Sequence, residues 1–115
     1  MIKVNNKVII KKHKFLEKDS LNQGLGLMFF PRSKYDFALI FDREKETRFG
    51  SAIHMFFVFF SINILFLNSK KEIVDIKKKL KPFTFYMPKK KARYIIELPI
   101  ETNISNLKIK DKVFW

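Results

Sequence analysis

Hydrophobic residues along this chain fall into short runs, each about the length of one β-strand and bounded by charged or turn-forming residues. Residues 1–15 alternate charged with apolar positions, which predicts a first strand with a turn at Asn5-Asn6. Its expected inward positions are Ile2, Val4, Val8 and Ile10. FALIF at 37–41 predicts one buried strand, whereas the charged DREKET at 42–47 predicts a hairpin loop, with a bend at Gly50.

The longest apolar run, Met55 to Leu67, lies at the centre of the chain. A helix that spans a bilayer needs about 20 consecutive apolar residues, and this run has 13, with Ser61 and Asn63 inside it. Phe, Ile and Val dominate the run and favour strands over helices. Together with a turn at 68–71 and the following EIVDIKKKL, it predicts strand–turn–strand. No transmembrane segment is expected, and a peripheral membrane anchor remains an alternative.

The C-terminal third continues the β pattern. Pro82 and Pro88 predict a loop, and ARYIIELP predicts a strong strand from Ala92 to Leu98. KIKDKVFW at 108–115 predicts a charged turn with a final strand. One short helix is expected near residues 20–26, because Ser20 or Asp19 can cap its start and a glycine can end it. A chain of 115 residues is the size of one domain, so residues 1–115 are predicted to form a single, mainly β domain.

Composition excludes several kinds of site. The chain has no cysteine, which excludes disulfides, thiolate metal sites and a cysteine nucleophile. Its two histidines, His13 and His54, cannot by themselves form a dedicated metal site, and neither a glycine-rich phosphate loop nor metal-ligand spacing occurs. No catalytic set, metal or cofactor is therefore expected. The N-terminus lacks the apolar core of a signal peptide, and the expected location is the cytoplasm.

Three polar residues in or beside the apolar runs are the candidate ligand-binding residues: His54, Asn63 and Glu97. His54 could act as an acid, a base or a ligand, or could be a histidine with one structural hydrogen bond. Asn63 interrupts an apolar strand and must satisfy its amide if buried, which favours a structural role. Glu97 alternates with Ile96 and Leu98 and so projects away from them, either into solvent or toward a basic partner such as Arg93.

The net charge of +13 comes from two segments. Residues 1–14 contribute +5 and residues 70–93 contribute +8, while the remaining bases and acids balance. Segments 7–14 and 70–93 could bind a polyanion such as a nucleic acid, with aromatic residues 83–86 available for stacking. The alternative is solvated lysine that protects strand edges. The candidate polyanion-binding residues are Lys11, Lys12, Lys14, Lys77, Lys78, Lys79, Lys81, Lys89, Lys90, Lys91 and Arg93.

Ordered blocks along the chain resemble the uncharacterised archaeal and bacterial family catalogued as domain of unknown function 192. The blocks are GLGLMF at 24–29, FALIF at 37–41, IHMFFVFFSINILFL at 53–67, IVDI at 73–76, ARYIIELP at 92–99 and IKDKV at 109–113. The resemblance covers roughly residues 20–115. It implies a small, antiparallel, barrel-like fold with one or two short helices, and it implies no established activity.

The central block departs from the family pattern, which commonly reads Trp-Met-Lys-Asn-Thr, two apolar residues, then Pro-Leu-Asp. Here Met55 is kept, His54 stands in place of the Trp, and Phe56 and Phe57 stand in place of Lys and Asn. Ser61 and Asn63 likewise stand in place of the Pro and the Asp. A polar cluster has become largely apolar, which argues against an enzyme.

The sequence does not specify a function. The first hypothesis is a small non-catalytic module that binds a ligand or a protein. Two alternatives remain: polyanion binding through the basic segments, and an enzyme of unknown class that uses His54, Asn63 and Glu97. The enzyme hypothesis requires those three side chains to converge in one pocket.

Overall fold

The structure is a computed structural model that describes residues 1–16 and 27–115. These residues form ten strands and one short 3-10 helix, and they include no helix long and apolar enough to cross a bilayer. The elements are β1 (Ile2–Val4), β2 (Lys7–Ile10), β3 (His13–Leu16), η1 (Arg32–Lys34), β4 (Ala38–Thr47), β5 (Ile53–His54), β6 (Ile62–Leu67), β7 (Ile73–Leu80), β8 (Phe85–Tyr86), β9 (Ala92–Pro99) and β10 (Val113–Phe114).

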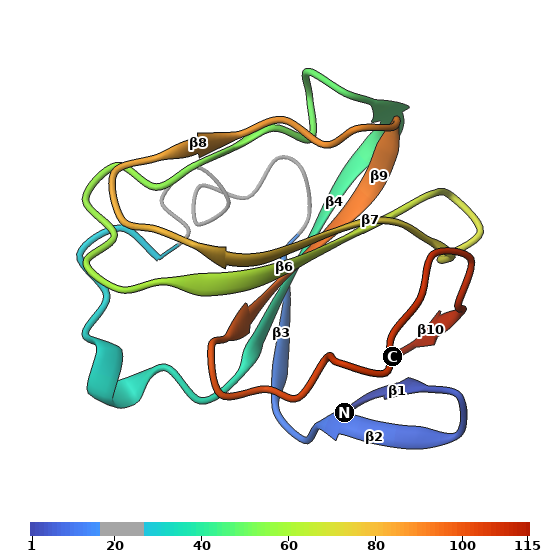
Figure 1. Cartoon of the computed structure of the whole chain (residues 1–115), viewed down its shortest axis with the longest axis horizontal. Helices are drawn as coiled ribbons and strands as arrows, with labels where there is room; N and C mark the ends of the chain where they lie inside the picture. The colour runs from blue at the N-terminus through green and yellow to red at the C-terminus, as the bar shows by residue number, and fades with distance from the viewer. Residues whose placement is uncertain (17–26) are drawn as a thin grey trace.

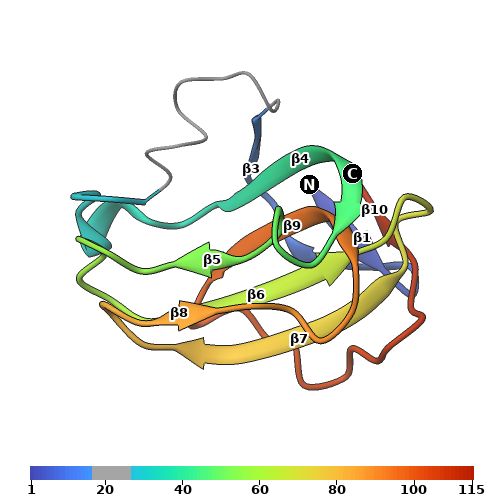
Figure 2. The ribbon, with the colours of Figure 1, turned by 90° about the horizontal axis from the view of Figure 1, so that it is seen from above.

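Three sheets make up the fold. The largest has the strand order β3-β4-β9-β6-β7, in which β3 and β4 are parallel and the other neighbours are antiparallel. A second sheet has the order β10-β1-β2, and the third is the β5-β8 pair. In Figures 1 and 2, the N-terminal sheet and the β5-β8 pair lie on different sides of the five-stranded sheet. The fold is barrel-like but not closed, because β3 and β7 remain edge strands.

The core consists of two clusters, one on each face of the five-stranded sheet. The first core cluster includes Leu39, Phe41, Ile53, Ile64 and Ile95. The second core cluster includes Ile2, Ile40, Leu65, Ile96 and Val113, and so joins the N-terminal sheet to the large one. Because both faces are covered, all six residues of β6 are buried, which is why its sequence shows a continuous apolar run rather than alternation.

Most of the predicted elements are confirmed. The mainly β, barrel-like class is correct, and β9 occupies residues 92–99, one residue longer than the predicted strand at 92–98. The turn at Asn5-Asn6 joins β1 to β2, and both asparagines have positive φ, at 53° and 63°, as two-residue hairpins favour. The helix expected near 20–26 lies outside the described residues, while the described helix, η1, follows Pro31.

Three predictions of detail are wrong. DREKET is the second half of β4 rather than a loop, because Thr47 still pairs with Ala92 and the Asp42 carboxylate binds Arg93 on β9. Residues 55–61 are a loop rather than a strand, because the Met55 carbonyl accepts hydrogen bonds from the backbone amides of Val58 and Phe83 and so turns the chain. Val8, expected to point inward, is 43% exposed.

Candidate functional site

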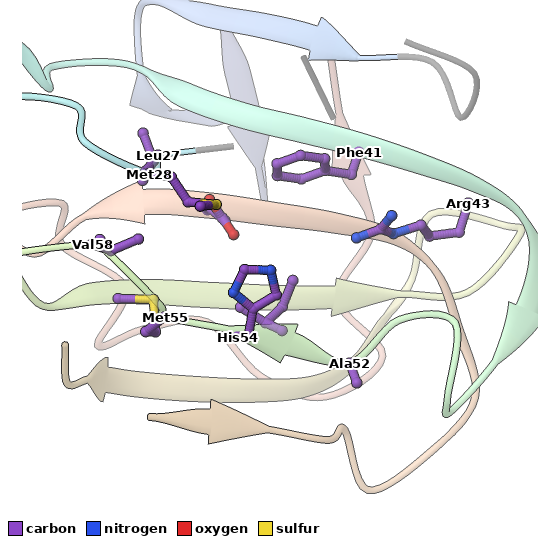
Figure 3. Close-up of a pocket in the computed structure, with 10 residues that line it drawn as sticks. Leu27, Met28, Phe41, Arg43, Ala52, His54, Met55 and Val58 are labelled. Carbon is purple, nitrogen blue, oxygen red and sulfur yellow. The ribbon is translucent and has the colours of Figure 1, made fainter. Parts of the chain in front are cut away.

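A small pocket lies on the side of the large sheet that carries the first core cluster. It has a volume of about 50 Å³ and is formed by residues of β4, β5, β9 and the loops before β4 and after β5. Figure 3 shows Arg43 reaching it from β4 and His54 from β5. Its other walls are largely apolar: Leu27, Met28, Phe41, Ala52, Ile53, Met55 and Val58. We call it the carboxylate pocket, after Glu97 of β9, its buried acid.

Glu97 reaches the carboxylate pocket because of its register in the sheet. It lies opposite Leu39 of β4 and Ile64 of β6, both members of the first core cluster, whereas Ile96 and Leu98 on either side belong to the second. The residue is only 6% exposed, and its carboxylate receives no hydrogen bond from the described part of the chain. Burial raises the pKa of Glu97 to about 7, and the charge of Arg43 opposes that rise.

Two further polar side chains interact electrostatically with Glu97. Arg43 is half-buried, and its guanidinium carbon lies 5.5 Å from the centre of the Phe41 ring. Burial lowers the pKa of Arg43, and the negative charge of Glu97 opposes this effect. Tyr35 is buried, and its hydroxyl makes no hydrogen bond with the described residues. Burial, and secondly the charge of Glu97, raise the pKa of Tyr35 well above its ordinary value.

His54 stands at the exposed rim of the carboxylate pocket. Its Nδ1 accepts a hydrogen bond of 3.3 Å from the backbone amide of Phe56, and the two rings are 5.3 Å apart. In the neutral imidazole this bond assigns Nδ1 as the acceptor and Nε2 as the donor. No group of three or more His, Cys, Asp or Glu side chains that could hold a metal ion occurs in residues 1–16 and 27–115.

Asn63 does not join the other two candidates. It lies between Ile62 and Ile64, which face the first core cluster, so its side chain points to the opposite face of β6. Its Oδ1 accepts a hydrogen bond of 2.9 Å from the Lys79 backbone amide, and its Nδ2 donates one of 3.4 Å to the Ile100 carbonyl. The structure therefore brings His54 and Glu97 to one pocket and gives Asn63 structural hydrogen bonds elsewhere.

The sequence did not identify Arg43 and Tyr35 as neighbours of Glu97. For Arg43 a signal was present: continuing the alternation of FALIF through DREKET places Arg43 on the same face as Leu39 and Phe41. Treating DREKET as a loop concealed it. For Tyr35 no local pattern exists, since the residue lies between η1 and β4 and reaches the core only through the tertiary fold.

The two basic segments lie far apart in the sheet order. Lys14 belongs to β3 at one edge of the five-stranded sheet, whereas Lys77, Lys78 and Lys79 belong to β7 at the other edge. Several of the candidate polyanion-binding residues have intramolecular partners. Lys12 forms an ion pair with Asp36, Lys14 lies over the Phe37 ring, and Arg93 makes a two-pronged contact with Asp42.

One part of the second basic segment forms a groove, which we call the lysine groove. It is lined by Lys77, Lys79 and Lys81 together with Leu80, Thr84, Phe85 and Tyr86, and it has a volume of about 220 Å³. Lys77 lies over the Tyr86 ring, 5.4 Å from its centre. Three lysines thus share one concavity with an exposed phenylalanine, whereas the other candidate bases do not line it.

The protein is thus an open barrel of mixed strands in which the acid of Glu97 is buried at a small pocket. The chain belongs to the family domain of unknown function 192, described as "Uncharacterized ACR", whose profile matches residues 14–115. The resemblance found in the sequence is therefore confirmed.

Archaeal relatives support the same assignment. The UPF0127 protein of Thermococcus sibiricus is 44% identical over 91 residues, which cover 78% of this chain and 57% of that protein. The UPF0127 protein of Pyrococcus horikoshii is 41% identical over 97 residues, which cover 83% of this chain and 80% of that protein. The chain thus spans little more than half the length of the first relative, and neither name states a function.

Two solved bacterial structures share the fold. A protein of unknown function from Novosphingobium aromaticivorans superposes with a TM-score of 0.74 at 19% identity, covering 90% of this chain and 74% of that one. A putative transcription regulator from Sinorhizobium meliloti superposes with a TM-score of 0.75 at 19% identity, covering 89% and 79%. At this identity, the likeness concerns the fold alone.

Proposed function

We propose that this protein is a non-catalytic binding module whose carboxylate pocket receives a small positively charged group, such as a protonated amine. The observation that supports it is the state of Glu97. Its carboxyl group is buried and receives no hydrogen bond from the described residues, yet it lines an open pocket. A buried carboxylate without hydrogen bonds is costly, so a ligand that supplies N–H donors would be bound there favourably.

The pocket's size and walls narrow the class of ligand. About 50 Å³ accommodates a few water molecules or one small functional group, far below the ~300–1,000 Å³ of pockets that enclose a whole drug-sized ligand. Phe41, Met55 and Val58 form apolar walls that suit the alkyl carbon beside an amine. Arg43 offsets only part of the cost of burying Glu97, so a second positive charge would still be stabilised.

Carbon-13 NMR of the glutamate carboxyl groups tests this proposal, with methylammonium as the probe and acetate as its counterpart of opposite charge. We expect methylammonium, and not acetate, to move the Glu97 resonance, with a millimolar dissociation constant because so small a probe makes few contacts.

The affinity for methylammonium should increase as the pH rises through 7, since the ionised carboxylate is the binding form. The effect should persist in Glu101→Gln, whose residue is exposed and paired with Arg32. Because Glu97→Gln removes the reporting carboxyl group, the backbone amide resonances of Met55 and Val58 in the pocket wall serve for that variant, and methylammonium should shift them in the wild type but not in Glu97→Gln. An equal response to acetate would overturn the proposal.

A catalytic function is the second candidate, and one observation favours it. The same pocket presents the His54 imidazole and the carboxyl group of Glu97, whose pKa of about 7 allows that carboxyl group to exchange a proton near neutral pH. Incubation with esters, amides and phosphate monoesters tests it. Turnover that is lost in both His54→Ala and Glu97→Gln would establish catalysis and remove the non-catalytic proposal.

We also place the module in the cytoplasm. A chain without cysteine gains no stability from an oxidising compartment. Fractionation of cells that produce the protein checks this assignment, and recovery from the extracellular fraction would contradict it.

A further inference from the structure

Four exposed phenylalanines meet at one end of the molecule. Phe29, Phe57, Phe59 and Phe83, which we call the phenylalanine tip, are 67%, 47%, 61% and 51% exposed. Phe29 stacks on Phe57 with ring centres 5.0 Å apart, and Phe59 lies 5.5 Å from Phe83. At about 200 Å² per phenylalanine, these exposed fractions amount to roughly 450 Å², a large apolar patch for a monomer surface.

Three separate loops build the phenylalanine tip. They precede η1, join β5 to β6 and join β7 to β8, and Figures 1 and 2 both show them at the same end of the molecule. Backbone hydrogen bonds fasten them together: the Phe29 amide donates to the Phe57 carbonyl, and the Phe83 amide donates to the Met55 carbonyl, each at 2.8 Å. The rings are therefore held side by side by the backbone.

The backbone at the phenylalanine tip adopts an unfavourable conformation. Phe29, Phe57 and Phe83 have φ of 60°, 56° and 61°, in the left-handed region that bulky side chains rarely occupy. Residues in such a conformation persist where the surrounding structure enforces it, and they cluster at functional sites. The exposed aromatic surface is thus maintained at the expense of local backbone stability.

The described segments that carry the phenylalanine tip contain basic residues and no acidic ones. Residues 27–34, 55–61 and 77–85 contain no acid, and their bases are Arg32, Lys34, Lys77, Lys78, Lys79 and Lys81. Arg32 is paired with Glu101, but three of the lysines line the lysine groove, which adjoins Phe83 through Thr84 and Phe85. An apolar tip bordered by lysines that form no ion pair with the described residues is complementary to a surface that is apolar inside and anionic outside.

We propose that this end of the protein docks on an anionic lipid bilayer, with the phenylalanine tip inserted among the acyl chains and a headgroup phosphate held in the lysine groove. The rings project from loop ends, which suits insertion into a flat membrane. Single-stranded nucleic acid stacks its bases on ring faces, and the stack of Phe29 on Phe57 already occupies one face of each of these two rings. A second copy of the chain would bring like charges together across the interface.

Vesicle cosedimentation tests the proposal, with phosphatidylcholine vesicles compared with vesicles that also contain phosphatidylglycerol. The tip variant is Phe29→Asn with Phe57→Asn and Phe83→Asn, because asparagine tolerates positive φ and the backbone can keep its course. The groove variant is Lys77→Gln with Lys79→Gln and Lys81→Gln. Circular dichroism and thermal unfolding establish that both variants fold.

Each variant has a matched control. Phe49→Asn removes a phenylalanine that is 83% exposed and outside the phenylalanine tip. Lys108→Gln with Lys110→Gln and Lys112→Gln removes three exposed lysines at the same spacing, and Lys110, like Lys79, has positive φ.

We expect the wild-type protein to bind the anionic vesicles, to bind neutral vesicles far more weakly, and to dissociate as salt increases. The tip variant should bind on the order of a thousandfold more weakly, at about tenfold for each of its three partly inserted rings. The groove variant should also lose roughly a hundredfold, at about fivefold for each lysine at the surface. Both controls should stay within about twofold of the wild type.

Four outcomes would overturn the proposal. One is no binding to anionic vesicles, and another is equal binding by the tip variant and the wild type. A third is an equal loss in the groove variant and its lysine control, which would mean general charge attraction. The last is a partner of another kind without vesicle binding: a single-stranded oligonucleotide released by both variants, or a dimer in sedimentation that the tip variant abolishes.

Discussion

At the scale of single residues, Glu97 makes stability depend on pH in an unusual direction. Burial raises its pKa from 4.5 to about 7, so the folded state holds a proton that the unfolded state releases. The protonated carboxyl group is therefore favoured in the fold below about pH 4.5, and this contribution is lost as the pH rises to about 7. The shift corresponds to about 3 kcal/mol.

We predict that Glu97→Gln raises the free energy of unfolding above pH 7 by up to about 3 kcal/mol, because the neutral amide resembles the protonated acid. The gain should disappear by about pH 4.5. Urea unfolding across this range measures it, with Glu101→Gln as the exposed control. Parallel pH profiles for Glu97→Gln and the wild type would show that Glu97 has an ordinary pKa in the fold.

The buried side chain of Asn63 stabilises the fold through two hydrogen bonds to the backbone. Replacement by leucine leaves the Lys79 amide and the Ile100 carbonyl without their partner. We predict that Asn63→Leu lowers the free energy of unfolding by about 2 kcal/mol. The response of Glu97 to methylammonium should be unchanged, because the two residues project from opposite faces of the sheet. Loss of that response in a folded Asn63→Leu protein would contradict this placement.

At the scale of elements, the segment with β8 is fastened to β7 by one buried acid. Asp75 is 5% exposed, and its Oδ2 accepts hydrogen bonds from the Tyr86 hydroxyl at 2.6 Å and the Lys89 amide at 2.9 Å. Burial, and then the bond to Asp75, raise the pKa of Tyr86 to about 12. The connection holds the far side of the lysine groove in place.

We predict that Tyr86→Phe lowers the free energy of unfolding by about 1.5–3 kcal/mol, the usual value of a hydrogen bond to a charged group. Tyr35→Phe is the matched control, since the Tyr35 hydroxyl is buried without a hydrogen bond in the described residues and its removal should cost almost nothing. Denaturant unfolding compares the two. A larger loss in Tyr35→Phe would mean that Tyr35 has a partner after all.

Strands and turns that depend on local sequence patterns were predictable, whereas those that depend on distant contacts were not. The β1–β2 turn was predictable because Asn-Asn favours positive φ, and β9 was predictable because every residue of ARYIIELP except Arg93 is buried. The extension of β4 was not, because it depends on Arg93, fifty-one residues from its partner Asp42. The loop at 55–61 was missed because its apolar residues are divided between core and surface: Met55, Val58 and Phe60 are buried, whereas Phe56, Phe57 and Phe59 are exposed.

The candidate site was predictable only in part, for the same reason. Alternation along β9 indicated the direction of Glu97, and the apolar context drew attention to His54. That these two share a pocket depends on the β5-β8 pair folding over β9 and β4, which no local pattern encodes. Asn63 lies on the opposite face of the sheet from His54 and Glu97, because side chains alternate along β6 and its neighbours Ile62 and Ile64 face the first core cluster.

At the scale of the whole molecule, the second core cluster joins the N-terminal sheet to the large sheet. Ile2 and Val113 from the former pack with Leu98 and Ile40 from the latter, so neither sheet can open without exposing the other. We predict that the protein unfolds as one cooperative domain. Trp115, whose ring packs 5.1 Å from Tyr94, reports on the C-terminal end by fluorescence, and far-ultraviolet circular dichroism reports on all strands. Two separated transitions would contradict a single domain.

The three phenylalanines with positive φ expose their rings to solvent and at the same time lower the stability of the fold. Glycine or asparagine at positions 29, 57 and 83 would relieve backbone strain of about 1 kcal/mol or more at each site. A lineage, or a laboratory screen, selected for heat resistance alone would therefore accumulate replacements at these three positions early. Phenylalanine is therefore retained at these positions only under selection for the exposed rings. The residues found at positions 29, 57 and 83 in relatives would then indicate whether the phenylalanine tip is functional in each of them.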